Sequence, residues 1–129
     1  RRPRVHASFS GRVQSWVLSG VQDAVARADM DWTTVHTQQK DGWFDVWGGK
    51  ARQADYIIVL FTREYKDRFT EALWMEAQLV HELHKKGTAV YIFDGEAMKP
   101  AEVAINLQDG VKTMGSFREW WDFCQNNHP

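Results

Sequence analysis

Two unbroken apolar runs frame the middle of the chain and predict a pair of buried parallel strands. The first run lies in residues 54–62 and the second in residues 88–93, with a long helical pattern between them. A strand that is buried on both faces is apolar without alternation, and a helix between two such strands forms the crossover of a parallel sheet. Residues 54–93 therefore predict a strand–helix–strand unit at the centre of the fold.

The helical pattern inside this unit carries one apolar stripe with a carboxylate within it. On a wheel of about 100° per residue, the stripe is formed by Phe69, Ala72, Leu73, Ala77, Leu79, Val80 and Leu83. Glu76 falls near the middle of the stripe. A carboxylate that faces a sheet is costly to desolvate unless it is paired or used, so Glu76 is the main functional candidate. The alternative is a glutamate at the edge of the stripe that pairs with Arg12, Arg63 or Arg68.

The flanking segments continue the alternation of strands and helices. Further strands are predicted at residues 4–9, 32–36 and 111–114, and helices at residues 12–27, 101–107 and 117–125. Residues 43–53 are ambiguous, because the pair Gly48-Gly49 weakens a helix. Ser116 and Glu119 form a capping box for the last helix.

This order of elements predicts an α/β fold with a three-layer, five-stranded parallel sheet in the flavodoxin-like order 2-1-3-4-5. The ligand crevice should then lie between the first and third strands, at the carboxyl ends. Phe9, Ser10, Gly11 and Arg12 follow the first strand and reach this point. Backbone N–H groups at the helix start, assisted by Arg12, suit a phosphate. Ordinary capping by Ser10 and loop turning by Gly11 is the alternative.

The composition is that of a globular domain. The chain has 129 residues, 43% hydrophobic and 26% charged, which suits one folded domain and excludes a disordered chain. A net charge of -1 gives no strong nucleic-acid signal, and no apolar run approaches the about 20 residues of a membrane span. A single cysteine, Cys124, favours a reducing, cytoplasmic compartment. Because residue 1 is Arg1, we expect residues 1–129 to be one domain excised from a longer chain.

Three motifs occur in a characteristic order along the chain. VHASFSG is a strand that runs into a Ser-Phe-Ser-Gly loop, KDGWFDVWGGKARQADYIIVLFTREY joins a loop and an apolar strand to a tyrosine, and SFREWWDF opens the last helix with a tryptophan pair. In this order and spacing they resemble the motifs of a Toll/interleukin-1 receptor (TIR) domain, or of a TIR-like or SEFIR-like relative. The resemblance covers almost the whole chain.

The resemblance implies a function as well as a fold. TIR domains include hydrolases that cleave NAD at the nicotinamide glycosidic bond, and signalling modules that assemble with themselves or with other TIR-like domains. By resemblance, Glu76 is the catalytic carboxylate, which would stabilise an oxocarbenium-like transition state. An aromatic ring among Trp43, Phe44 and Trp47 would stack on an adenine or nicotinamide ring or dock a neighbouring subunit. The alternative is that these residues close the edge of the sheet as core, which we prefer for Phe44 and Trp47, with Trp43 the better candidate for exposure. The implied substrate contacts are Phe9, Ser10, Gly11, Arg12, Trp43, Phe44, Tyr65 and Thr70, with NAD as substrate and no cofactor.

The motif around Glu76 departs from the pattern of the NAD hydrolases. Many of them carry a tryptophan four residues before the glutamate, whereas Trp74 lies two residues before Glu76. Ala72 takes the usual tryptophan position and Thr70 the usual serine position. The segment WMEA also resembles the nucleoside deoxyribosyltransferases, which place a glutamate beside a nucleotide pocket. Three functions therefore stay open: an NAD glycohydrolase, a signalling scaffold without chemistry, and a deoxyribosyltransferase-like nucleotide-binding domain.

No metal site is expected. His81 and His84 flank Glu82 at a spacing of three residues, whereas the zinc motif of this type needs four. We interpret both histidines as solvated or packed side chains, and Cys124 as a small core residue.

Overall fold

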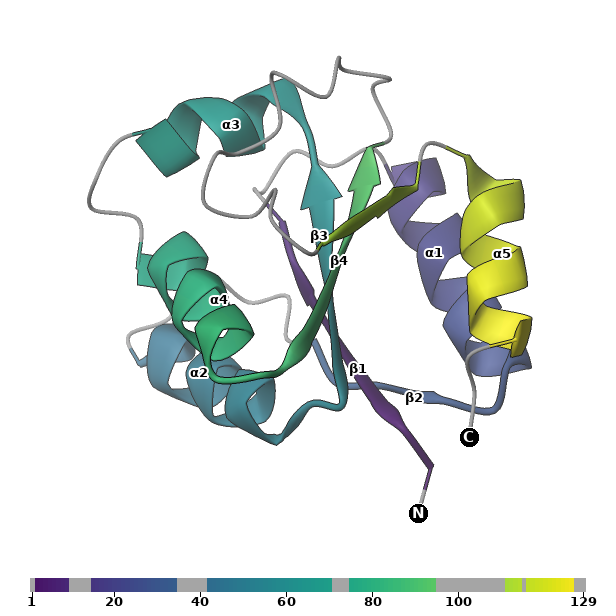
Figure 1. Ribbon diagram of the computed structural model, residues 1–129, viewed down its shortest axis with the longest axis horizontal. Coiled ribbons are helices and arrows are strands. Elements are labelled where there is room, and N and C mark those ends of the chain that lie inside the picture. Colours follow the sequence, from purple (N-terminus) through teal and green to yellow (C-terminus); the bar gives the residue numbers. More distant parts are fainter. Residues whose placement is uncertain are drawn as a thin grey trace.

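Five parallel strands form one sheet with helices on both faces (Figure 1). The computed structural model describes residues 2–9, 15–34, 42–70, 75–94, 111–114 and 116–126. The elements in chain order are β1 (Arg4–Ser8), α1 (Ser15–Arg27), β2 (Asp31–Trp32), α2 (Trp43–Gln53), β3 (Tyr56–Phe61), α3 (Arg63–Thr70), α4 (Met75–Lys85), β4 (Ala89–Asp94), β5 (Lys112–Met114) and α5 (Phe117–Asn126).

The strand order is β2-β1-β3-β4-β5, and every neighbouring pair is parallel. This confirms the predicted α/β class and the order 2-1-3-4-5. The central strand, β3, is buried from Ile57 to Phe61 because α1 and α5 cover one face of the sheet while α2 and α4 cover the other (Figure 1). Burial on both faces explains why its sequence is apolar without alternation.

Alternating side chains of the strands feed two separate cores. The α1/α5 core is formed by Val5, Ala7, Phe9, Val21, Ala24, Val25, Ala28, Met30, Ile58, Leu60, Phe93, Met114, Trp120, Phe123 and Cys124. The α2/α4 core is formed by Trp47, Ala51, Ile57, Val59, Phe61, Tyr65, Leu79, Val80, Leu83, Val90 and Ile92. The even-numbered residues of β1, His6 and Ser8, therefore point toward the α2/α4 side of the sheet.

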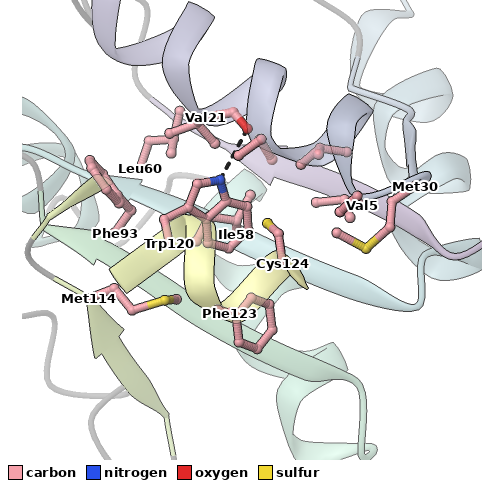
Figure 2. Close-up of a cluster of buried hydrophobic side chains, with 14 of the residues drawn as sticks. Val5, Val21, Met30, Ile58, Leu60, Phe93, Met114, Trp120, Phe123 and Cys124 are labelled. Atoms are coloured by element: carbon pink, nitrogen blue, oxygen red, sulfur yellow. Dashed lines mark hydrogen bonds between the residues drawn. The ribbon is translucent and has the colours of Figure 1, made fainter. Parts of the chain in front are cut away.

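Trp120 fastens α5 to α1 inside the α1/α5 core (Figure 2). Its side chain is fully buried, and its indole Nε1–H donates a hydrogen bond of 3.1 Å to the carbonyl oxygen of Val21. The neighbouring Trp121 is only partly buried. Cys124 lies beside Trp120 with 1% of its surface exposed, which confirms its interpretation as a core residue.

The single long helix expected after β3 is wrong, because the structure has two helices there, α3 and α4. The apolar stripe belongs to α4, which buries Ala77, Leu79, Val80 and Leu83 together with Glu76. Among the described side chains of α3 only Tyr65 is buried. Residues 71–74 lie outside the described part of the chain. The wheel still placed Glu76 correctly, since its buried neighbours all lie on α4.

The second strand is shorter than predicted and begins earlier. β2 pairs with β1 only through Arg4↔Asp31 and Val5↔Trp32, and Thr33 and Thr34 follow without strand structure. Beyond that point, side chains rather than a neighbouring strand bind the backbone of β1. Residues 35–36 and the helix predicted at 101–107 lie outside the described residues, as do residues 12–14 of the first helix.

The ambiguous segment 43–53 is a helix, α2, despite its two glycines. A Cβ on Gly48 would come within 3.2 Å of Leu79 Cδ2 on α4 and of Arg52 Nη1, so the glycine allows α2 and α4 to lie close together. Gly49 has nothing within 4 Å of the same position. Ser116 Oγ accepts the N–H of Glu119 at 3.2 Å, as the predicted capping box requires. Gly87 ends α4 with a φ of 100°, a left-handed conformation that glycine adopts easily.

Candidate functional site

The carboxylate of Glu76 is buried at the carboxyl end of β1. It lies in the first turn of α4 with 1% of its surface exposed. The hydroxyl of Ser8 donates a hydrogen bond of 2.6 Å to Oε2, and the backbone N–H of Phe9 donates one of 3.1 Å to the same oxygen. Hydrogen bonds of this kind favour the charged form of a carboxylate, so Glu76 can place a negative charge at this edge of the sheet.

The N–H of Phe9 is available to Glu76 because β2 ends too early to pair with it. Alternate residues of β1 direct their backbone groups toward β2. The carbonyl of Val5 accepts the N–H of Thr33 at 3.0 Å. At Ala7 two side chains replace the missing strand: Thr34 Oγ1 accepts its N–H, and Trp47 Nε1 donates to its carbonyl at 3.2 Å. Glu76 continues this series at Phe9, so the carboxylate also terminates the strand.

Tyr65 extends the hydrogen bonds of Glu76 to a third element. Its hydroxyl lies 2.9 Å from Ser8 Oγ, and its side chain is fully buried against Phe61, with ring centroids 5.8 Å apart. Thr62 caps α3 by accepting the N–H of Tyr65 at 3.1 Å, which fixes the helix start just after β3. Burial, and then the negative charge of Glu76, raise the pKa of Tyr65 well above its ordinary value, while its bond to Ser8 acts in the opposite direction.

The three hydrogen-bonded side chains lie at the switch point of the sheet. β1 and β3 are neighbours, with Ser8 opposite Val59. The helix that follows β1 covers one face, and the helices that follow β3 lie on the other side (Figure 1). Open α/β sheets bind ligands outside the carboxyl ends of their strands at this kind of reversal. The structure therefore brings Glu76 to the edge where the strand order predicts a ligand.

Two buried polar residues near the site were not recognised from the sequence. His6 is fully buried on the same face as Ser8, with Nδ1 3.0 Å from Thr33 Oγ1 and its ring 4.8 Å from Trp47. Asp94 is 5% exposed at the carboxyl end of β4, where strand alternation directs it to the α2/α4 side. A polar residue at the end of an apolar run is the only signal for Asp94, and one histidine in a short strand is no signal of burial.

The structure brings two of the predicted substrate contacts to Glu76 and leaves others apart. Phe9 meets it through its backbone N–H, and Tyr65 reaches it through Ser8. Trp43 and Phe44 lie in α2, half-buried against the α2/α4 core, with ring centroids 5.7 Å apart. Their predicted contact with a base stays a prediction.

The remaining predicted contacts are not placed by the structure. Ser10, Gly11 and Arg12 lie outside the described residues, as does Trp74, and the side chain of Thr70 is not described. Of the proposed arginine partners of Glu76, Arg63 is exposed and the side chains of the other two are not described.

Metal and thiol chemistry find no support in the described part of the chain. There, no group of three or more histidine, cysteine, aspartate or glutamate side chains is arranged to hold a metal ion. Burial raises the pKa of the Cys124 thiol to about 12, so the thiolate that would be the nucleophile is scarce at neutral pH. No helix of the described segments is long and apolar enough to cross a membrane.

Comparison with known proteins adds no family. No protein-family model matches this chain, and no curated protein is significantly similar to it. The motifs, the strand order and the geometry around Glu76 are therefore the grounds on which a function can be proposed.

Proposed function

We propose that this TIR-like domain cleaves the N-glycosidic bond of NAD or a related nucleotide, with Glu76 as the catalytic carboxylate. The observation that carries the proposal is the position of Glu76, hydrogen-bonded to Ser8 and Phe9 at the carboxyl end of β1. This is the switch point of a 2-1-3-4-5 sheet, where a nucleotide is expected. The TIR-like order of motifs supports the same assignment.

The reaction needs one negative charge close to the ribose. The bond between C1′ and the nicotinamide nitrogen breaks, and nicotinamide leaves with the bonding electron pair. Positive charge develops on C1′ and the ring oxygen, and an adjacent carboxylate stabilises it. Water then adds to C1′ and loses a proton, so the products are ADP-ribose, nicotinamide and one proton. Because Glu76 is 1% exposed, neighbouring side chains must move before the ribose can reach it, and we expect slow turnover.

The first prediction concerns nicotinamide release by Glu76→Gln. The amide keeps the shape of the side chain and an oxygen for the two donors, but it removes the charge, so we expect release to fall by at least about 100-fold. The measurement is nicotinamide formed from NAD at high protein concentration, because TIR-type activity often needs assembly. The matched control is Glu82→Gln, on the exposed face of the same helix, which should keep the wild-type rate. No nicotinamide release by the wild-type domain, or an equal rate of release by Glu76→Gln, would contradict the proposed enzymatic function.

A second candidate function is assembly without chemistry. Two large apolar side chains are exposed on neighbouring helices, Val46 on α2 with 53% and Met75 on α4 with 54% of its surface. The net charge of -1 leaves little repulsion between copies. These features suit a second copy of this domain as the partner. In that case Glu76 would have a structural role, because it binds the backbone N–H of Phe9 at the end of β1 without any substrate.

A further inference from the structure

We propose that Tyr65 and Ser8 are positioning residues, which hold the Glu76 carboxylate through a directed chain of two hydrogen bonds. The chain joins α3, β1 and α4, with oxygen–oxygen distances of 2.9 Å and 2.6 Å. Its effect on turnover rests on the proposed function, whereas the chain itself can be tested without any substrate. Tyr65, expected above to touch the substrate, would then act through Ser8.

The direction of the chain follows from the number of protons. An ionised carboxylate only accepts hydrogen bonds, so the single hydroxyl proton of Ser8 goes to Glu76 Oε2. Ser8 then has no proton for Tyr65, so the tyrosine hydroxyl must donate to Ser8 Oγ. A serine that receives a hydrogen bond becomes a better donor, because hydrogen bonds in series polarise one another. Tyr65 therefore strengthens the bond that Ser8 makes to Glu76.

Packing anchors both hydroxyl donors, Ser8 and Tyr65. Ser8 lies in a strand paired with β3 on one side, and it is fully buried. The ring of Tyr65 lies in the α2/α4 core, and its backbone is capped by Thr62. The donors therefore lose little conformational freedom when they bind the carboxylate, as preorganised groups should.

Tyr65 also keeps its proton over the working pH range. Burial and the negative charge of Glu76 both raise the pKa of the phenol, so the ionised form is absent near neutral pH. The hydroxyl is then a donor whenever Glu76 is charged. The same coupling means that neutralising Glu76 should change the environment of the Tyr65 hydroxyl.

The kinetic test uses Tyr65→Phe, which keeps the buried ring and removes only the hydroxyl. Losing one polarising hydrogen bond should lower kcat about fivefold to tenfold and leave KM unchanged. The acid limb of the kcat/KM profile should move to higher pH, because a weaker bond to the carboxylate favours its protonated form. Tyr91→Phe, which lies on the α1/α5 side of the sheet, is the control and should change neither. A fall in activity with an unmoved pH profile would indicate a merely structural hydroxyl and overturn the proposal.

A double-mutant cycle tests whether the two residues act in series. Ser8→Ala breaks the chain at its centre, so adding Tyr65→Phe to it should cause no further loss of kcat. Independent contributions would multiply instead. A loss of kcat in the double variant equal to the product of the two single losses would overturn the proposed chain of hydrogen bonds.

An NMR titration separates this inference from the proposed function. With labelled carboxyl and phenol carbons, the Glu76 midpoint should rise in Tyr65→Phe and in Ser8→Ala, and stay unchanged in Tyr91→Phe. In the wild-type domain the Tyr65 Cζ signal should follow the Glu76 midpoint and lose this step in Glu76→Gln. That measurement decides the question even where a variant does not fold. If these shifts are present but no nicotinamide is released, the proposed enzymatic function is contradicted and the chain of hydrogen bonds is supported. A Tyr65 signal that stays fixed as Glu76 titrates would overturn the chain of hydrogen bonds.

Discussion

His6 is a neutral side chain held where a charged one is costly. It is fully buried, and burial, followed by the positive charge of Lys50, lowers its pKa from 6.5 to about 4, against the opposing effect of its hydrogen bonds. Among the described residues, no group lies where it could accept a hydrogen bond from Nε2, so a second proton on this nitrogen would be unsatisfied. The imidazole therefore stays unprotonated in the folded domain until well below its ordinary range.

This burial predicts a loss of stability in mild acid. Well above the ordinary histidine pKa of 6.5, both the folded and the unfolded chain carry a neutral His6, so it has no effect on stability there. As the pH falls toward 4, the unfolded chain takes up a proton that the folded chain refuses, and the free energy of unfolding should drop by about 3 kcal/mol.

Urea unfolding at about pH 7 and about pH 4.5 measures the drop. His6→Gln should remove most of it, while His81→Gln on α4 should keep it. An equal pH dependence in His6→Gln and the wild type would contradict the assignment to His6.

Sequence reasoning reached Glu76 but not its partners. A glutamate inside an apolar stripe is visible because helical periodicity is a local property. Its contacts are not local: Ser8 lies 68 positions away from Glu76, and Tyr65 lies 57 positions away from Ser8. Only the strand order, which places the end of β1 beside α3 and α4, brings them together. The sequence therefore predicted the burial of Glu76 and the edge of the sheet, but not the hydrogen bonds.

At the scale of single elements, the two glycines of α2 have different roles. A Cβ on Gly48 would lie only 3.2 Å from Leu79 Cδ2 on α4, so the neighbouring side chains would have to shift, whereas Gly49 faces open space. Their place in one helix allows a comparison in which only the neighbouring atoms differ.

Gly49→Ala should raise the free energy of unfolding by about 0.5–1 kcal/mol, because alanine favours helix and meets no neighbour. Gly48→Ala should give less or none of this gain, because its methyl group would press on Leu79 and Arg52 at 3.2 Å. Urea denaturation of the two variants measures the difference. An equal gain at both positions would show that Leu79 and Arg52 move aside without cost and would contradict a packing role for Gly48.

The elements that the sequence predicted least well are those whose limits depend on a neighbour. Residues 32–36 have strand-forming side chains, yet β2 ends at Trp32, and the side chains of Thr34 and Trp47 bind the backbone of Ala7 in place of a longer strand. The glycine pair weakens the helical pattern of residues 43–53, and the packing of Gly48 against Leu79 is not visible in the sequence. β3, by contrast, was recognised from its apolar run alone, because burial on both faces leaves that mark in the sequence.

At the scale of the whole molecule, the alternation of strands and helices was sufficient to predict the topology. Parallel strands need crossovers, and crossovers of one hand leave few strand orders for five strands. The division of helices between the two faces follows from the order, and so does the switch point beside Glu76.

Association of whole domains is the prediction that belongs to this scale. If Val46 and Met75 form a contact between copies, the mass measured by light scattering should rise with protein concentration above the 15.0 kDa of one chain. Val46→Ser combined with Met75→Ser should hold the mass at one chain. Gln125→Ser, exposed on α5 across the sheet, is the control. A constant single-chain mass for the wild type at high concentration would count against assembly.

The side chains that complete β1 have one more consequence, for contacts between unrelated chains. Because β2 has two residues, the outer edge of β1 would invite an extended segment of another protein to add itself as a strand. Thr34 and Trp47 already bind the N–H and the carbonyl of Ala7, and Glu76 binds the N–H of Phe9, all of which such a segment would need. The carboxylate proposed for catalysis therefore also occupies a backbone donor at this edge of the sheet, and a substitution of Glu76 would change both.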